Sequence, residues 1–75
     1  MKEQEIITKV KNIMPIIDMI AQKRNLGFDY GYRYAATPPY WECELYDESG
    51  KTIEYYKAET TAELINLIKT KNNGQ

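Results

Sequence analysis

Apolar residues recur along this chain with two different periods, and the change of period divides it into three parts. In the first part they follow one another at steps of three and four, which is typical of one face of an α-helix. The residues that carry this stripe are Ile6, Val10, Ile13, Ile17 and Ile20. The pattern predicts that residues 1–25 are helical.

Pro15 is expected to interrupt this predicted helix, and Gly27 is expected to end it. Pro15 lacks a backbone donor and crowds the preceding turn, so we expect a kink or break near residues 12–14. Lys23 and Arg24 lie in the expected last turn, where cations favour the negative end of the helix dipole. Gly27 follows, and we expect it to stop the helix.

The second part changes to a period of two and holds every aromatic residue of the chain. Phe28, Tyr30, Tyr32 and Tyr34 occupy alternate positions, which places them on one face of a β-strand over residues 28–35. Neither helical segment contains an aromatic residue. We therefore expect this row of rings to turn inward and cover the helices.

Two further strands are predicted at residues 40–46 and 52–58. Pro38 and Pro39 separate the first strand from the second, because proline cannot continue a central ladder. Residues 47–51 have the composition of a hairpin turn, with Gly50 at the left-handed position. The whole sheet region is then residues 28–58.

The hairpin predicts its own register. A turn centred on Ser49 places the apolar residues of both strands on one inner face, and that match is lost if the register slips by one residue. The expected pairs are Tyr46 with Thr52, Leu45 with Ile53, Glu44 with Glu54 and Cys43 with Tyr55. The inner face would then hold Trp41, Cys43, Leu45, Ile53 and Tyr55. The Glu44–Glu54 pair would be repulsive, and Arg33 is its expected neutralising partner.

The third part returns to a helical period. Thr60 and Glu63 form a capping box at its start. Its apolar face is Leu64, Ile65, Leu67 and Ile68. We expect helix over residues 60–71, with fraying from Lys69 onward. The prediction for residues 1–75 is thus one α+β domain of two layers in the order α-β-β-β-α, with both helices on one face of a three-stranded antiparallel sheet.

This order, together with two stretches of sequence, resembles the double-stranded-RNA-binding domain. The stretch PIIDMIAQKRNL at residues 15–26 is similar to that family's first helix, and PPYWECEL at residues 38–45 is similar to its loop and second strand. The resemblance implies the fold and, as an alternative function, RNA binding through Lys9, Lys11, Lys23 and Arg24. The family's lysine-rich start of the second helix is replaced here by Glu59 and Glu63, and the chain has no histidine.

Charge and composition narrow the function further. The net charge is −1, but residues 28–63 hold eight acids against three bases. Such a distribution lacks the concentrated positive patch that phosphate backbones require. The single cysteine excludes an intrachain disulfide and favours a reducing, cytoplasmic location. The longest apolar run, residues 14–17, is far shorter than the ~20 residues of a membrane span.

The residues that carry chemistry are few. Without histidine the commonest general base and metal ligand are missing, and no glycine-rich phosphate loop is present. Cys43 alternates with Trp41 and Leu45, which predicts a buried thiol. The carboxylates of Glu42, Glu44 and Glu54 are predicted on a solvated sheet face or paired with Arg33. These features predict no enzyme activity, no cofactor and no metal.

The leading hypothesis is therefore a non-catalytic binding protein that engages a protein partner with a basic surface. The contact would lie on the outer sheet face, at Tyr40, Glu42, Glu44, Tyr46, Glu54 and Tyr56. In size and style the chain is similar to accessory or inhibitor proteins of bacteriophages and prophages. The alternatives are the RNA-binding module above and a structural subunit of an assembly, which an exposed edge of the first strand would favour.

Overall fold

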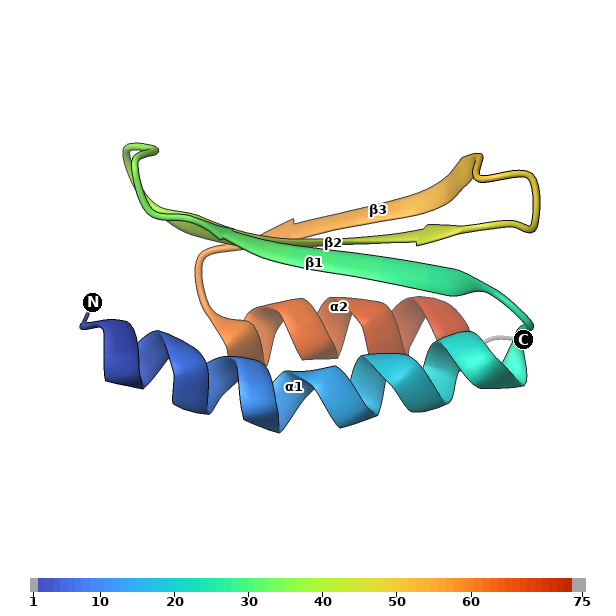
Figure 1. The fold of residues 1–75 in the computed structure, drawn as a ribbon, viewed down its shortest axis with the longest axis horizontal. Helices are drawn as coiled ribbons and strands as arrows, with labels where there is room; N and C mark the ends of the chain where they lie inside the picture. Colours follow the sequence, from blue (N-terminus) through green and yellow to red (C-terminus); the bar gives the residue numbers. More distant parts are fainter. Residues whose placement is uncertain (1, 74–75) are drawn as a thin grey trace.

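A computed structural model describes residues 2–73 and confirms the predicted order and layers. The elements are α1 (Glu3–Lys23), β1 (Gly27–Arg33), β2 (Tyr40–Tyr46), β3 (Thr52–Ala58) and α2 (Thr61–Asn73). The three strands form one antiparallel sheet in the order β1-β2-β3. Both helices lie side by side against the same face of that sheet (Figure 1). No helix or strand of residues 2–73 covers the other face, which is called the outer face below (Figure 1).

The core lies between the sheet and the helices, where the apolar faces of α1, α2 and the sheet meet. The fully buried residues are Ile13, Ile17 and Ala21 of α1, Trp41, Cys43 and Leu45 of β2, and Leu64 and Ile68 of α2. Phe28, Tyr30 and Tyr32 pack against this cluster, as the alternation predicts. Tyr34 does not. The strand ends one residue before it, and its side chain is 76% exposed.

The first helix is continuous through Pro15, so the expected break at residues 12–14 does not occur. Pro15 is exposed, whereas Ile13 and Ile17 on either side of it are buried at 3% and 0% exposure. Packing therefore holds both halves of the helix on the same sheet and offsets the backbone hydrogen bond that proline removes.

Asn25, rather than Gly27, ends this helix. Asn25 adopts the left-handed conformation with φ of 57°. Its N–H donates to the carbonyl of Gln22 at 3.1 Å, and the N–H of Leu26 donates to the carbonyl of Ala21 at 2.9 Å. These two bonds are the Schellman pattern, which asparagine also supports because its short polar side chain tolerates a positive φ.

Gly27 instead allows a close approach within the sheet. It pairs with Tyr46 across β1 and β2, and a Cβ atom at Gly27 would lie only 2.7 Å from Cζ of the Tyr46 ring. The Tyr46 hydroxyl donates to the carbonyl of Phe28 at 3.3 Å, which holds the ring over the glycine. A side chain at position 27 is thus incompatible with the position of this ring.

The hairpin between β2 and β3 departs from the predicted register immediately after its first pair. Tyr46 is opposite Thr52 as expected, but the register then shifts so that Leu45 is opposite Glu54. The expected pairs Leu45–Ile53, Glu44–Glu54 and Cys43–Tyr55 are wrong. Glu44 instead faces Tyr55, and Cys43 faces Tyr56. Ile53 is the extra residue of a β-bulge, which reverses the facing of every later side chain of β3.

The bulge corrects the predicted inner face as well. Ile53 and Tyr55, expected inside, are 42% and 53% exposed. Tyr56, expected outside, belongs to the core at 9% exposure. Glu54 also turns toward the helices, so the repulsive Glu44–Glu54 pair does not form.

The second helix begins with one half of the predicted capping box and extends further than predicted. The N–H of Glu63 donates to Oγ1 of Thr60 at 3.1 Å, and the Thr60 hydroxyl donates to the Glu63 carboxylate. The helix continues to Asn73 instead of fraying after residue 68. Asn72 accepts a hydrogen bond from the guanidinium of Arg24, which fixes the last turn. The fraying predicted for Gln75 and the residue before it lies outside the described residues. Leu67, predicted on the apolar face, is 46% exposed.

We predict that Gly27→Ala lowers the free energy of unfolding by about 1–3 kcal/mol, because the new methyl group forces the Tyr46 ring away. In a Tyr46→Ala background the same substitution should cost almost nothing. Urea unfolding of the four chains measures this coupling. Gly31→Ala is the matched control, since its Cβ would meet nothing nearer than the Glu42 carboxylate at 3.6 Å. An equal loss in both backgrounds would contradict the proposed clash.

Candidate functional site

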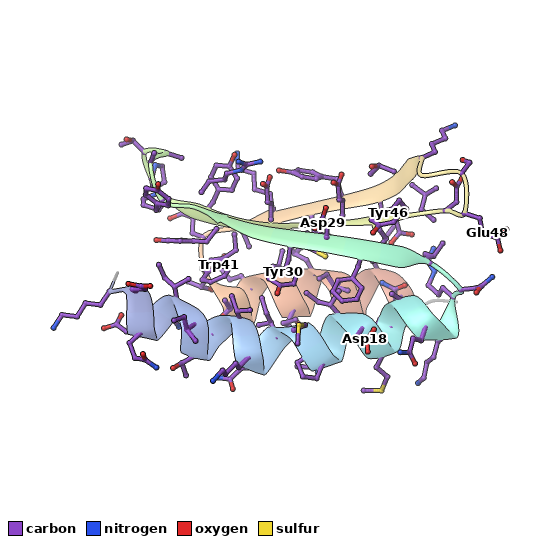
Figure 2. The ribbon with its side chains drawn as sticks, in the orientation of Figure 1. Asp18, Asp29, Tyr30, Trp41, Tyr46 and Glu48 are labelled. Carbon is purple, nitrogen blue, oxygen red and sulfur yellow. The ribbon has the colours of Figure 1, made fainter. Side chains whose placement is uncertain are left out.

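Polar and aromatic side chains from all three strands cover the outer face of the sheet. Figure 2 shows Asp29 on this side, whereas Tyr30 and Trp41 lie between the sheet and the helices. The cross-strand pairs place these outer-face residues together: Asp29, Arg33, Tyr40, Glu42, Glu44, Tyr46, Tyr55 and Lys57. The outer face is therefore one connected surface to which all three strands contribute side chains.

One chain of contacts crosses the face from β1 to β3. Nε of Arg33 lies 2.5 Å from Oε2 of Glu42, and the Tyr55 hydroxyl donates to Oε1 of the same carboxylate at 2.8 Å. The hydrogen bond to Glu42, with partial burial and the nearby negative charge, raises the pKa of Tyr55 to about 12. The expectation that Arg33 neutralises a Glu44–Glu54 pair is wrong, because that pair does not form; Arg33 instead pairs with Glu42, another of the predicted outer-face carboxylates.

The second cation on this face, Lys57, also has a partner. Nζ of Lys57 lies 4.2 Å from the centre of the Tyr40 ring, within the range of a cation–π contact. The Thr52 hydroxyl donates to Oε2 of Glu44 at 3.0 Å, which is a neutral partner for that charge. Both bases of the outer face therefore have partners, and neither is an ion-pair partner of Glu44.

Two carboxylates remain without a cation. Asp29 and Glu44 are directly opposite each other on β1 and β2, and within residues 2–73 neither forms an ion pair. Like charges at opposite positions of a sheet are destabilising. They line a shallow hollow of about 350 Å³ together with Arg33, Glu42 and Tyr55. This hollow is negatively charged and aromatic, and it would be stabilised by an added cation.

The structure divides the predicted partner-binding residues between two faces. Tyr40, Glu42, Glu44 and Tyr46 lie on the outer face as expected. Glu54 and Tyr56 do not, because the bulge turns them toward the helices. Asp29 and Tyr55 take their place, and the sequence pattern did not single them out. Asp29 could have been found from its alternation with the inward Phe28 and Tyr30, but Tyr55 could not be found without knowledge of the bulge.

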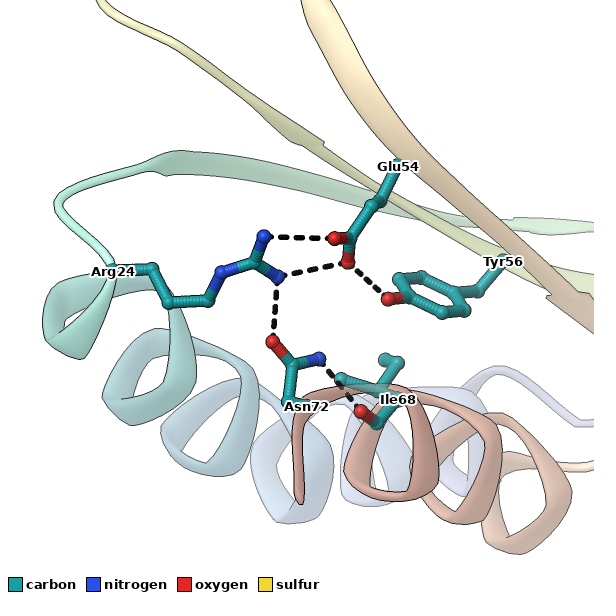
Figure 3. A network of polar contacts seen from close by, with 5 residues as sticks. All are labelled: Arg24, Glu54, Tyr56, Ile68 and Asn72. Carbon is teal, nitrogen blue, oxygen red and sulfur yellow. Dashed lines mark hydrogen bonds and ion pairs between the residues drawn. The ribbon is translucent and has the colours of Figure 1, made fainter. Parts of the chain in front are cut away.

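On the inner side, Glu54 is the centre of a network that joins β3 to both helices (Figure 3). Its carboxylate lies 2.8 and 2.9 Å from the two terminal nitrogens of Arg24 at the end of α1. The Tyr56 hydroxyl donates to the same carboxylate. Arg24 also donates to Oδ1 of Asn72, whose amide nitrogen donates to the carbonyl of Ile68 at 2.7 Å.

This network shifts the titration of its members. The hydrogen bond from Arg24 lowers the pKa of Glu54 against the opposing effect of burial, and the Tyr56 hydroxyl adds to the lowering. Burial and the adjacent carboxylate raise the pKa of Tyr56. Because the partners satisfy the charges of Glu54 and Arg24, the network stabilises the packing of the helices on the sheet and offers no free group for chemistry.

The four residues of the alternative RNA-binding set are not equivalent. Lys11 and Lys23 are exposed, and Lys9 is half-buried. Arg24 is held by Glu54 and Asn72 and is therefore not available to a phosphate. At the start of α2 the exposed charges are Glu59 and Glu63, both acidic. The start of α2 therefore adds no positive charge to these residues, whereas Lys69 in its later part lines the same hollow as Lys23.

Cys43 is buried in the core at 1% exposure, as the alternation predicts. Burial, with the nearby charges of Glu44 and Asp29, raises the pKa of its thiol to about 12. A thiolate nucleophile is therefore disfavoured. Among the described residues no group of three or more carboxylate or thiol side chains is placed to hold a metal ion.

Neither α1 nor α2, over the part of the chain that the structure describes, combines the length and the apolar content that crossing a membrane requires. Comparison of the sequence with protein-family models and with curated proteins found no match, and comparison of the fold with solved structures found none. The outer face must therefore be interpreted from its own residues.

We predict that stability falls in acid through the Glu54 network. A carboxyl whose pKa is lowered by folding contributes stability above its unfolded pKa, near 4.5, and this contribution is lost as the pH falls through the folded value. Thermal unfolding from pH 7 to pH 3 should thus show a smaller decrease in Tm for Glu54→Gln than for the unaltered chain. At pH 7 the variant should be less stable by about 2 kcal/mol, because it loses charged hydrogen bonds.

The hairpin carboxylate of Asp47 also has a lowered pKa, because it accepts bonds from Ser49 and from the backbone of Lys51. Asp47→Asn is therefore the control, since it removes an acid-sensitive carboxylate that lies outside the Glu54 network. If Glu54→Gln leaves the pH dependence unchanged while Asp47→Asn removes it, the proposed role of the network is wrong.

We predict that the thiol of Cys43 does not react with an aromatic disulfide reagent at pH 8 while the chain is folded. The reaction should become complete in ~6 M guanidinium chloride, because unfolding exposes the sulfur and restores its ordinary pKa. Absorbance of the released thiolate measures both rates. Rapid reaction in the folded state would show that the sulfur is accessible.

Proposed function

We propose that this chain is a small, non-catalytic binding protein whose outer sheet face contacts a basic patch of a protein partner. The observation that carries this proposal is the pair of opposed carboxylates, Asp29 and Glu44, which lacks a cation within the described residues. A lysine or arginine of a partner placed between them would relieve their repulsion.

The surroundings of this pair support protein recognition. Tyr55 is 53% exposed beside the two carboxylates, and Tyr40 and Tyr46 are half-buried on the same face. Tyrosine provides a large contact area at low entropic cost, together with a hydroxyl for hydrogen bonding. Contacts with Glu42 and Lys57 already order two of these rings, so binding would immobilise few additional side chains.

This proposal is favoured over RNA binding by the charge of the exposed surfaces. The outer face repels phosphate, and Arg24 is engaged in the inner network. An acidic surface suits a small regulatory protein, such as an accessory or inhibitor protein acting inside the cell, better than a module that binds nucleic acid.

We predict that Glu44→Lys abolishes capture of the partner, because it replaces attraction with repulsion at the centre of the face. The measurement compares proteins retained from an extract of the source cells by the tagged unaltered chain and by the variant, at a series of salt concentrations. Glu5→Lys is the matched control, since Glu5 is an exposed acid on α1 and the change in net charge is the same.

The proposal requires that a partner retained by the unaltered chain and by Glu5→Lys is lost with Glu44→Lys, and that its retention weakens as salt rises. Equal retention by both variants would exclude the outer face. A parallel titration with double-stranded RNA at ~50 mM salt tests the alternative. Tight, salt-dependent RNA binding would favour that alternative over the proposal.

A further inference from the structure

The two edges of the sheet are unequally protected against pairing with another strand. At the β3 edge the structure has a bulge at Ile53, an inward-pointing charge at Glu54 and an exposed lysine at Lys57. Each of these features blunts an edge strand. The β1 edge has none of them, since Gly27–Arg33 runs in unbroken register against β2 and contains no proline or lysine.

We propose that two copies of this chain pair through their β1 strands, antiparallel, with Gly31 opposite Gly31 of the second copy. The two sheets would then form one sheet of six strands, with both helical layers on the same side. This proposal concerns the edge of the sheet: it assigns Asp29 to the second copy and leaves Glu44 to the partner proposed for the outer face.

The register follows from two requirements. Directly opposed residues of an antiparallel pair point to the same side of a sheet, so the outer faces coincide only when outward residues oppose outward residues. This restricts the symmetry axis to a residue position of β1. An axis at Asp29 opposes two aspartates, and an axis at Arg33 opposes two arginines. An axis at Tyr30 or Tyr32 opposes each charge to an uncharged residue or to one outside the strand.

Only the axis at Gly31 places Asp29 opposite Arg33 of the second copy, and it does so twice. Asp29 is exposed, faces Glu44, and forms no ion pair within residues 2–73. The side chain of Arg33 is 63% exposed and contacts Glu42 through Nε, which leaves its two terminal nitrogens for a second carboxylate. The pairing thus supplies a cation where the single chain lacks one.

The inner side of the same edge is compatible with this pairing. In this register Tyr30 is opposite Tyr32 of the second copy, and such aromatic cross-strand pairs stabilise sheets. Below the edge, Met14 of α1 is 42% exposed and accepts a hydrogen bond from the Tyr30 hydroxyl at 3.6 Å. Ile7, two helical turns earlier, is 39% exposed. A second copy would cover this apolar flank.

Complementary charge variants test the proposal. Asp29→Arg alone and Arg33→Asp alone each oppose like charges twice, so each should raise the dissociation constant of the dimer by about tenfold or more. In an equimolar mixture of the two variants every opposed pair regains opposite charges, and the dimer should return. Sedimentation equilibrium measures the mass, and circular dichroism confirms that each variant is folded.

Cross-linking tests the register independently. Gly31→Cys should form a disulfide between two copies on mild oxidation, because the two cysteines would be directly opposed and a Cβ at position 31 meets only ordinary contacts. Lys57→Cys on the protected β3 edge is the control and should remain unlinked. Cys43 does not interfere, since it is buried.

A monomeric mass at ~1 mM chain would overturn the proposal. A dimer whose mass does not respond to the charge variants, or that cross-links no better at position 31 than at position 57, would also overturn it by showing a different interface. Glu44→Gln, which removes an outer-face charge without placing a cation opposite Asp29, should leave the dimer mass unchanged. Failure of partner capture and failure of dimerisation are thus separate results.

Discussion

The β-bulge at Ile53 is the constraint on which both faces of the sheet depend. Without it, Ile53 would be buried, a gain of about 1.5–3 kcal/mol, and Glu54 would oppose Glu44 on the outer face. With it, Glu54 reaches Arg24, and hydrogen bonds to charged groups contribute about 1.5–3 kcal/mol each. Since Tyr56 enters the core in place of Tyr55, little aromatic burial is lost. The balance therefore favours the bulged register.

The same residue connects local geometry to the layers of the fold. Because β3 turns Glu54 inward, a strand at one edge of the sheet holds the last turn of α1 through Arg24 and the last turn of α2 through Asn72. Elements far apart in sequence thus meet around the guanidinium of Arg24, which contacts both Glu54 and Asn72 at the end of the helical layer (Figure 3). On the other face, the reversal places Tyr55 over Glu42, which completes the contact chain from Arg33.

Most of the fold could be predicted because its signals are periodic. The steps of three and four in α1 and the alternation in β2 each bury a single face, so the bounds of β2 and β3 and the inward position of Trp41 follow from sequence alone. The departures depend on tertiary contacts that no period contains. Asn25, and not Gly27, takes the left-handed conformation that ends α1. Gly27 has a different role, because the Tyr46 ring leaves no space for a side chain at that position. Asn72 extends α2 because Arg24 is within reach.

The candidate site shows the same division. Tyr40 to Tyr46 could be assigned to the correct face, because β2 is uniform and its buried partners fix the alternation. Beyond the hairpin, a single inserted residue decides which side chains of β3 face inward. The sequence pattern is satisfied equally well with Ile53 and Tyr55 inside, so it does not reveal the bulge. The competing contact, from Glu54 to Arg24, joins residues 30 positions apart. Such a contact becomes visible only when the helix and the strand are placed together.

The outer face and the β1 edge are linked through the guanidinium of Arg33. Within one chain this group neutralises Glu42 and leaves Asp29 and Glu44 opposed. In the proposed pair of chains its free nitrogens would neutralise Asp29 of the second copy, which leaves Glu44 of each copy as the acid without a cation. Two such acids on one continuous sheet would favour a partner that presents two basic patches, because binding at one site raises the effective concentration at the other. The pairing of chains would in this way concentrate the contact on Glu44 and strengthen it without any new residue.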